Sequence, residues 1–196
     1  MARSPFNPFM GQSIKSAAGR TDKGFIAHYI IEAADAAAAA VNAIAPVTTL
    51  ADGSTTTLTT ADIDQPTTPR VLSVTGNAAG AAGDVVITGT DAAGEALVET
   101  IVATGANTVA GTKAFASVET IVLPARGAGG DTIAVGATGA FGIPFVLPHD
   151  TVVKILNNNV PTTVASSSWS STVLADNYIT PTAALAGNQI DVYLIV

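Results

Sequence analysis

The chain has 196 residues, a formal net charge of −7, no cysteine, and only 12% charged residues against 48% hydrophobic ones. A chain of this length buries roughly 70% of its unfolded surface as one domain, so it needs neither a metal nor a disulfide to hold a core. The absence of cysteine excludes disulfides, thiolate catalysis and thiolate metal sites together. Glu32 and Asp35 interrupt the longest apolar run, and no apolar leader begins the sequence, so we expect neither a membrane-spanning helix nor an exported chain.

The low share of charged residues is about half of the ~25% that is usual in globular proteins. Large areas of Ala, Thr, Gly and Val are poorly solvated on a free monomer. This composition favours a subunit whose surface is covered in an assembly, with a soluble monomer that has a Thr-rich exterior as the alternative.

The first 23 residues differ in charge and composition from the rest of the chain. They carry four basic residues against one acidic residue, a net charge of +3, which leaves −10 on the remainder. The segment has two prolines and no periodicity, which predicts an extended arm over residues 1–24. In this interpretation its aromatic and basic side chains contact a neighbour, and the alternative is a disordered tail. The candidate contacts are Arg3, Phe6, Phe9, Met10, Lys15, Arg20 and Lys23. Four dispersed basic residues on an acidic body make a poor phosphate footprint, so we expect no nucleic-acid partner.

Residues 25–69 form a second segment, which we expect to pack on the body. Phe25–Ile31 is a candidate strand. Glu32–Ala45 is rich in alanine, which allows one short helix, although a nearly all-methyl face buries little area and a loop fits as well. Val47–Leu50 and Ser54–Leu58 flank Asp52-Gly53, which predicts a Thr-rich hairpin.

The main domain, residues 70–196, alternates short β-branched runs with small-residue turns. Val85–Thr88 and Ala96–Val102 flank a four-residue loop with Asp91 first and Gly94 last, which predicts a hairpin. The polar residues in the second run predict one solvated face and allow a bulge. Val118–Leu123 and Thr132–Val135 bracket a glycine-containing loop, and we expect these two strands to be antiparallel neighbours.

Further strands are predicted toward the C-terminus. Thr151–Leu156 and Val160–Ala165 flank a turn of three asparagines, and the chain finishes in the apolar run Gln189–Val196. Such an apolar end is an aggregation hazard unless it is built into a sheet. Turn signals recur about every 8–12 residues, which predicts an all-β fold: an antiparallel β-sandwich or barrel with a hairpin meander.

Few residues point to chemistry. His28 lies in a strand-like apolar run and His149 in a loop, and both are interpreted as structural. Glu95, Glu99 and Glu119 are expected to be exposed strand carboxylates. No calcium-loop or phosphate-loop spacing is present, so we predict no catalytic residue, no cofactor and no metal site. Trp169 is a candidate partner contact, with a lid over the core as the alternative.

Four segments of the chain resemble a family of small structural proteins from the head region of tailed bacteriophages. They include the phrase TG-x-x-x-x-G-E, the GTKAF segment, the LPH-x-T-V segment and the DVYLIV ending, within Val85–Pro124, Gly130–Gly136, Phe141–Asn159 and Ile190–Val196. The resemblance covers most of residues 70–196. Members of such families resemble capsid decoration, or cement, proteins, which bind outside an assembled shell and stabilise it.

The resemblance implies a non-enzymatic virion protein on the outer surface of the capsid, made in the cytoplasm of a host bacterium. Its expected partners are the major capsid protein of a phage head and further copies of itself, with a trimer favoured. One alternative is a tail-tube, tail-tip or fibre component of a phage. Another is a carbohydrate-binding β domain, which a composition of only 5% aromatic residues disfavours.

Overall fold

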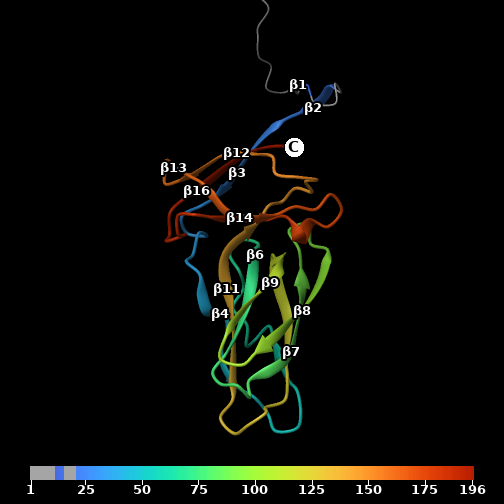
Figure 1. Cartoon of the computed structure of the whole chain (residues 1–196), viewed down its shortest axis with the longest axis vertical. Coiled ribbons are helices and arrows are strands. Elements are labelled where there is room, and N and C mark those ends of the chain that lie inside the picture. The colour runs from blue at the N-terminus through green and yellow to red at the C-terminus, as the bar shows by residue number, and fades with distance from the viewer. Residues whose placement is uncertain (1–11, 16–20) are drawn as a thin grey trace, which may run out of the picture.

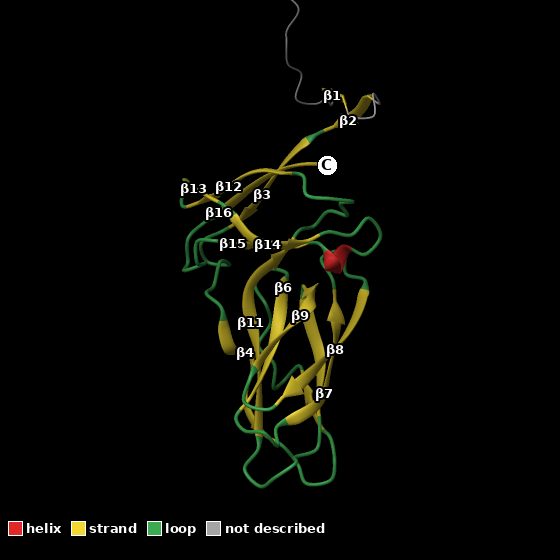
Figure 2. Cartoon of the chain, viewed as in Figure 1, coloured by secondary structure: helices red, strands yellow, loops and turns green. Residues whose placement is uncertain are grey.

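The computed structural model describes residues 12–15 and 21–196, and in those ranges the fold is all-β with antiparallel strands, as the sequence predicts. Figure 2 shows that strands and loops make up nearly the whole chain, with one turn of 3₁₀ helix at Leu174–Asp176. The strands are β1 (Gln12–Lys15), β2 (Thr21–Gly24), β3 (Ile26–Ile31), β4 (Ala40–Thr49), β5 (Thr56–Thr59), β6 (Arg70–Gly76), β7 (Ala82–Thr90), β8 (Ala96–Thr104), β9 (Thr108–Phe115), β10 (Ser117–Leu123), β11 (Thr132–Gly142), β12 (Val152–Asn157), β13 (Val160–Thr162), β14 (Val164–Ser168), β15 (Tyr178–Pro181) and β16 (Ile190–Ile195).

Two sheets form the elongated body of the molecule (Figure 1). One has the order β5-β10-β7-β8; the other has the order β14-β15-β11-β6-β9, with β4 paired beside the first half of β11. Alternate side chains of both sheets point inward, because successive residues of a strand face opposite sides. They form a first core in which Leu72, Ile87, Phe115, Ile121 and Ile133 are at most 1% exposed. The body is therefore the β-sandwich that the sequence predicts.

A third sheet, of order β13-β12-β16-β3, lies across one end of this body (Figure 1). Its inner face covers a second core, to which β16 contributes Ile190, Val192 and Leu194, all fully buried. The long strand β11 supplies Ile133 to the first core and Phe141 to the second, and so joins the two. The C-terminal run is thus a central strand, which confirms the prediction that it is built into a sheet.

The hairpin of β7 and β8 is confirmed. Asp91 Oδ1 accepts hydrogen bonds from the N–H groups of Ala93 at 2.8 Å and Glu95 at 3.1 Å, and Gly94 takes the positive φ of +80° that closes the loop. Buried and exposed residues alternate strictly along β8, so it has the expected single solvated face. The bulge that the sequence allowed is absent from this pairing, which runs without a register shift from Ala82 to Thr90.

Two other pairings predicted as hairpins are wrong. β10 and β11 belong to different sheets, and so do β4 and β5. The turns themselves are present, with Gly53 at a φ of +62° and Gly130 at +86°. Each turn carries the chain from one layer of the sandwich to the other. A short turn can connect strands in opposing layers as well as neighbouring strands of one sheet. The fold therefore contains hairpins but no meander through the body.

The alanine-rich segment Glu32–Ala45 is not helical. Residues 33–35 form a turn, residues 36–39 have no regular secondary structure, and β4 begins at Ala40. Ala40 and Val41 pass so close to Gly136 of β11 that a Cβ at residue 136 would overlap their backbone. The small residues of β4 and Gly136 permit this close approach of the two backbones. Pairing with β11 therefore stabilises residues 40–45 as part of a strand, although alanine on its own favours a helix.

Arg70 fastens this segment to the sheet. Arg70 is 2% exposed and forms no ion pair with a carboxylate of the described residues; it donates to the carbonyl oxygens of Thr138, through two nitrogens, and of Ala37 at 2.9 Å. Burial lowers the pKa of the guanidinium below its usual value. The carbonyl of Thr138 lies where the pairing of β6 and β11 is interrupted, between Ala137 and Phe141, so Arg70 satisfies a backbone group that the sheet leaves free.

Candidate functional site

The outer side of the sheet β13-β12-β16-β3 is the most distinctive surface of the described residues. The register sets Lys154, Tyr193 and His28 in one row across the strands, Leu156, Asp191 and Ile30 in the next, and Ile195 beside Ile26. We call this surface the end face and define it as Ile26, His28, Ile30, Lys154, Leu156, Asp191, Tyr193 and Ile195. The alternate residues Ala27, Tyr29, Val192 and Leu194 face the second core.

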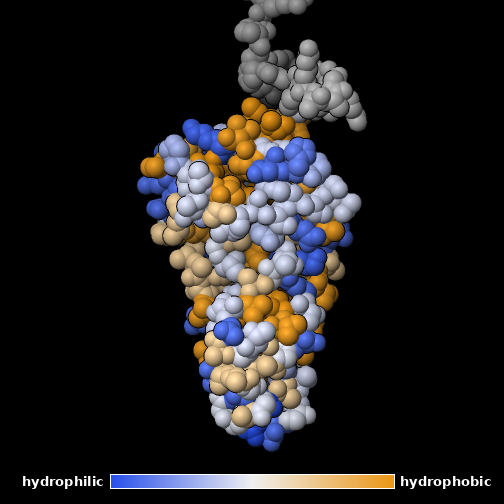
Figure 3. All heavy atoms as spheres, viewed as in Figure 1, coloured by the Kyte–Doolittle hydropathy of each residue, from blue (hydrophilic) through white to orange (hydrophobic). Residues whose placement is uncertain are grey.

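Four of the eight residues of the end face are aliphatic, namely Ile26, Ile30, Leu156 and Ile195, although this face points away from the core. Ile26 is 66% exposed and Ile30 is 40% exposed on this side of the sheet. Phe25 and Val196, at 46% and 40% exposed, are paired at the strand ends and alternate to the opposite side. Figure 3 shows hydrophobic residues gathered at this end of the body, next to the place where the N-terminal segment joins it. Exposed isoleucines on the outer side of a sheet make this face a candidate interaction surface.

A hydrogen-bonded group of polar side chains crosses the end face. His28 Nε2 lies 2.8 Å from Asp191 Oδ1, and Gln189 Nε2 donates to both carboxylate oxygens of Asp191, at 3.1 and 3.2 Å. The side chain of Asp191 is only 7% exposed, so these bonds compensate its burial. No hydroxyl group of the described residues bonds to His28, so the pair lacks the nucleophile of a hydrolytic triad. The group acts as a cross-strand tie between β3 and β16.

Glu99 is a second buried polar group, and the expectation that it is exposed is wrong. It is 7% exposed, while Glu95 and Glu119 are exposed as expected. Glu99 Oε1 accepts hydrogen bonds from the backbone N–H of Thr112 at 2.5 Å and from its hydroxyl at 3.0 Å. Because Glu99 is on β8 and Thr112 on β9, the carboxylate bridges the edges of the two sheets, and Glu99 Oε2 has no partner. Gly111 leaves the room that this carboxylate occupies.

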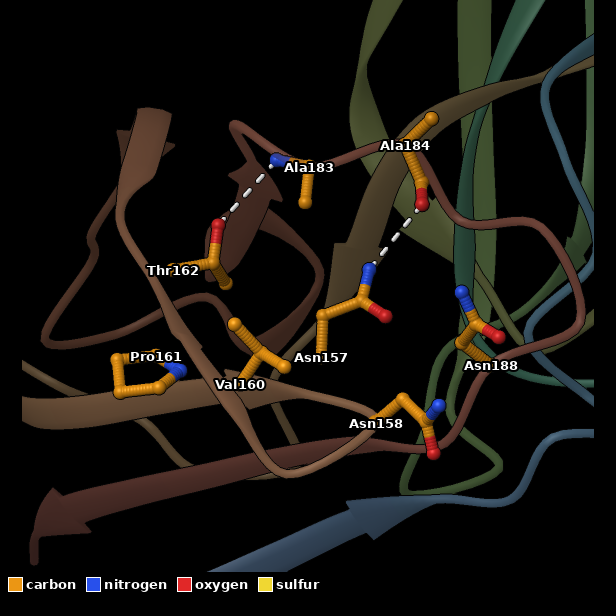
Figure 4. Close-up of a pocket in the computed structure, with 8 residues that line it drawn as sticks. All are labelled: Asn157, Asn158, Val160, Pro161, Thr162, Ala183, Ala184 and Asn188. Carbon is orange, nitrogen blue, oxygen red and sulfur yellow. Dashed lines mark hydrogen bonds between the residues drawn. The ribbon is translucent and has the colours of Figure 1, made fainter.

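An open pocket of about 380 Å³ lies beside the turn between β12 and β13 (Figure 4). Asn158 and Asn159 form this turn at φ values of +50° and +64°, a conformation that asparagine tolerates. Asn157 Nδ2 is engaged by Ala184 O at 3.1 Å. The pocket is lined by Asn157, Asn158, Val160, Pro161, Thr162, Ala183, Ala184 and Asn188. With no aromatic ring among these residues, the pocket lacks the platform on which a sugar stacks.

The candidate contacts named from the sequence fall in different places. Trp169 is half-buried and packs against the second core, the position of a lid. Lys15 lies on β1 and Lys23 on β2, and the two strands pair with each other as a separate two-stranded sheet. Arg3, Phe6, Phe9, Met10 and Arg20 lie outside the described residues. The end face itself was not predicted, because its strands come from both ends of the sequence.

The remaining candidates in the described residues are a metal site, a second histidine site and a membrane-spanning helix. No group of three or more His, Asp or Glu side chains there is arranged to hold a metal ion. His149 is exposed in its loop. None of the helical structure in residues 12–15 and 21–196 is long and apolar enough to cross a bilayer.

Comparison of the chain with models of protein families, with curated proteins and with solved structures finds no match. The geometry of the end face and the sequence resemblance are therefore the two grounds on which a function can be proposed.

Proposed function

We propose that this chain is a non-enzymatic structural protein of a bacteriophage virion: a capsid decoration protein that binds the assembled head and stabilises it. The observation that carries the proposal is the end face with its exposed Ile26 and Ile30, which begins on β3 next to Phe25. A sheet face on which exposed isoleucines surround a hydrogen-bonded polar group suits a protein partner better than a soluble substrate. The sequence resemblance supplies the kind of partner, the major capsid protein, and the location on the outer surface of the capsid.

In this proposal the end face and the N-terminal segment both contact the shell. The segment of residues 1–23 carries a net charge of +3 and includes Phe6, Phe9 and Met10, so it offers both charge and apolar anchors. The long axis of the sandwich then projects away from the shell, because the end face lies at one extremity of the body (Figure 1). Each contact is weak alone, and stabilisation comes from many copies that hold neighbouring capsomers together.

The main alternative is a tail-tube, tail-tip or fibre component of the same kind of particle. The elongated body is compatible with both locations. The two differ in assembly, because a tube subunit polymerises by itself, whereas a decoration protein binds to a shell that has already formed.

Co-sedimentation with emptied, expanded heads of the phage that encodes the protein tests the proposal. We expect saturable binding by the full chain, and weaker binding by a deletion of residues 1–23 and by Leu156→Glu, which places a charge on the end face. Val98→Glu is the matched control, because Val98 is 56% exposed on β8, away from the end face. Melting temperatures check that each variant is folded.

Absence of binding by the folded full chain, or spontaneous tubes or fibres in its place, would contradict the decoration role. Equal binding by Val98→Glu and Leu156→Glu would show that the end face is not the contact. Raising the salt concentration separates the two kinds of anchor, since screening weakens contacts of the basic residues far more than those of the aromatic ones.

A further inference from the structure

The sheet that carries the end face has two unequal edges. β13, at one edge, has three residues and includes Pro161, which lacks the N–H that edge pairing needs. β3, at the other edge, has six residues, IAHYII, with no proline and no Lys, Arg, Asp or Glu. Short length, proline and charge are the features by which proteins protect edge strands, and β3 has none of them.

The outward backbone groups of β3 follow from its pairing with β16. Phe25 and Val196 exchange both of their backbone hydrogen bonds, at 2.9 Å each, so they form a hydrogen-bonded pair. In an antiparallel ladder such pairs alternate with pairs that point outward. The N–H and C=O groups of Ile26, His28 and Ile30 therefore point away from β16. Within the described ranges, β3 pairs only with β16.

We propose that two copies of the chain pair through β3, antiparallel, about a two-fold axis at His28. This register sets Ile26 opposite Ile30 of the second copy, His28 opposite His28, and Ile30 opposite Ile26. All three outward-pointing residues then form hydrogen-bonded pairs, about six bonds in total. A register displaced by two residues leaves one of these three residues unpaired in each copy. The register centred on His28 is therefore the one in which all three form hydrogen-bonded pairs.

Side chains and charge favour the same pairing. Ile26 and Ile30, at 66% and 40% exposed, become cross-strand neighbours on the continued end face and lose apolar surface to water. Each copy has a net charge of −7, and β3 is a segment where two acidic copies can meet without placing like charges opposite each other. Asp191, the acidic residue on the adjoining strand, is covered by His28 and Gln189.

The result is one continuous sheet of eight strands whose two end faces merge into a single larger apolar surface. A two-fold pair is expected in place of the trimer that the family resemblance implies, because Pro161 prevents the opposite edge from closing a ring with β3. The pairing does not depend on the phage role, since it needs no particle.

Sedimentation equilibrium of the full chain, together with two substitutions at one position, tests the pairing. His28→Ala keeps the backbone N–H and removes the imidazole, whereas His28→Pro also removes the N–H at the two-fold axis. We expect a dimer for the full chain and for His28→Ala, and a dimer at least about tenfold weaker for His28→Pro. A monomer at every concentration, a trimer, or a dimer equally strong in both variants would overturn the proposal.

Spin labels provide a second measurement that does not rely on the proline variant folding. The chain contains no cysteine, so a single introduced cysteine is labelled uniquely. The register places the two Cα atoms of residue 28 about 5.5 Å apart and those of residue 26 about 14 Å apart. Labels on His28→Cys should therefore broaden each other strongly, labels on Ile26→Cys less, and labels on Val98→Cys not at all. Equal broadening at residues 26 and 28 would contradict this register.

Discussion

The imidazole of His28 and the ring of Tyr193 stack face to face across the end face, with centroids 4.3 Å apart and planes inclined by 8°. The two residues are direct partners on β3 and β16, and His28 also bonds to Asp191. A stacked cross-strand pair contributes on the order of 0.2–1 kcal/mol beyond the backbone hydrogen bonds. This contact and the hydrogen bond between His28 and Asp191 hold β3 against β16.

Alkaline pH should weaken the attachment of β3 through Tyr29. Burial raises the pKa of Tyr29, whose hydroxyl lies 3.3 Å from Thr68 Oγ1 and whose ring lies near Phe141. The unfolded chain loses this proton from about pH 10, while the folded chain keeps it, so stability falls as pH rises above 10 toward the raised pKa. Tyr29→Phe should show a smaller loss over this window in denaturant titrations. An equal loss in both proteins would show that Tyr29 does not contribute.

Removal of the Glu99 carboxylate should destabilise the body by opening the edge between β8 and β9. Glu99→Ala removes the carboxylate that accepts from the N–H and hydroxyl of Thr112, and hydrogen bonds to a charged group contribute about 1.5–3 kcal/mol to the free energy of unfolding. Glu99→Gln keeps one acceptor oxygen and should cost less. Glu95→Ala, an exposed position on the same hairpin, is the control and should change stability by less than about 0.5 kcal/mol. Equal losses for Glu99→Ala and Glu95→Ala would refute the bridging role.

Gly136 should not tolerate a side chain, because β4 passes directly over it. A Cβ at this position overlaps backbone atoms of Ala40 and Val41, so Gly136→Ala must displace a strand and should cost about 1–3 kcal/mol or more. Gly139→Ala, three residues along the same strand, meets only a methyl group of Thr180 at 3.7 Å and should be nearly neutral. Thermal unfolding of the two variants makes the comparison, and similar melting temperatures would contradict the close approach of β4 and β11.

The C-terminal strand should be essential for the second core. Leu194 is fully buried on β16, an inner strand of the sheet β13-β12-β16-β3, which we call the end sheet, so Leu194→Ala should cost about 2–5 kcal/mol. Val160→Ala, at a position that is 64% exposed on β13, is the control and should cost no more than about 0.5 kcal/mol. Deletion of residues 190–196 should unfold the end sheet entirely, and a deletion variant with an unchanged melting temperature would refute this.

Sequence patterns predicted those features of the fold that depend on neighbouring residues. The hairpin closed by Asp91 and Gly94 follows from turn chemistry within a few residues, and so does the turn at Asn158-Asn159. The C-terminal strand follows from its apolar run. Sheet membership was missed for β4, β5, β10 and β11, because a turn signal shows that the chain reverses and does not show which layer it enters.

The polar sites were missed for a related reason. His28 and Asp191 are 163 positions apart in the sequence, and only the pairing of β3 with β16 brings them together. Glu99 was expected to be exposed because it is a carboxylate in a hairpin, yet the alternation of β8 places it on the inner side, where Thr112 of β9 donates hydrogen bonds to it. For the alanine-rich segment, residue propensity did not decide between a helix and a loop. The strand β4 that begins within it packs closely on Gly136, which is nearly a hundred residues away in the sequence.

The most direct test of the proposed role is the temperature at which emptied, expanded phage heads rupture, followed by calorimetry as the protein is added. A decoration protein binds the intact shell and not its separated subunits, so the rupture temperature should rise with occupancy and level off at saturation. Saturating binding that leaves the rupture temperature unchanged would contradict the central claim that this protein stabilises a capsid.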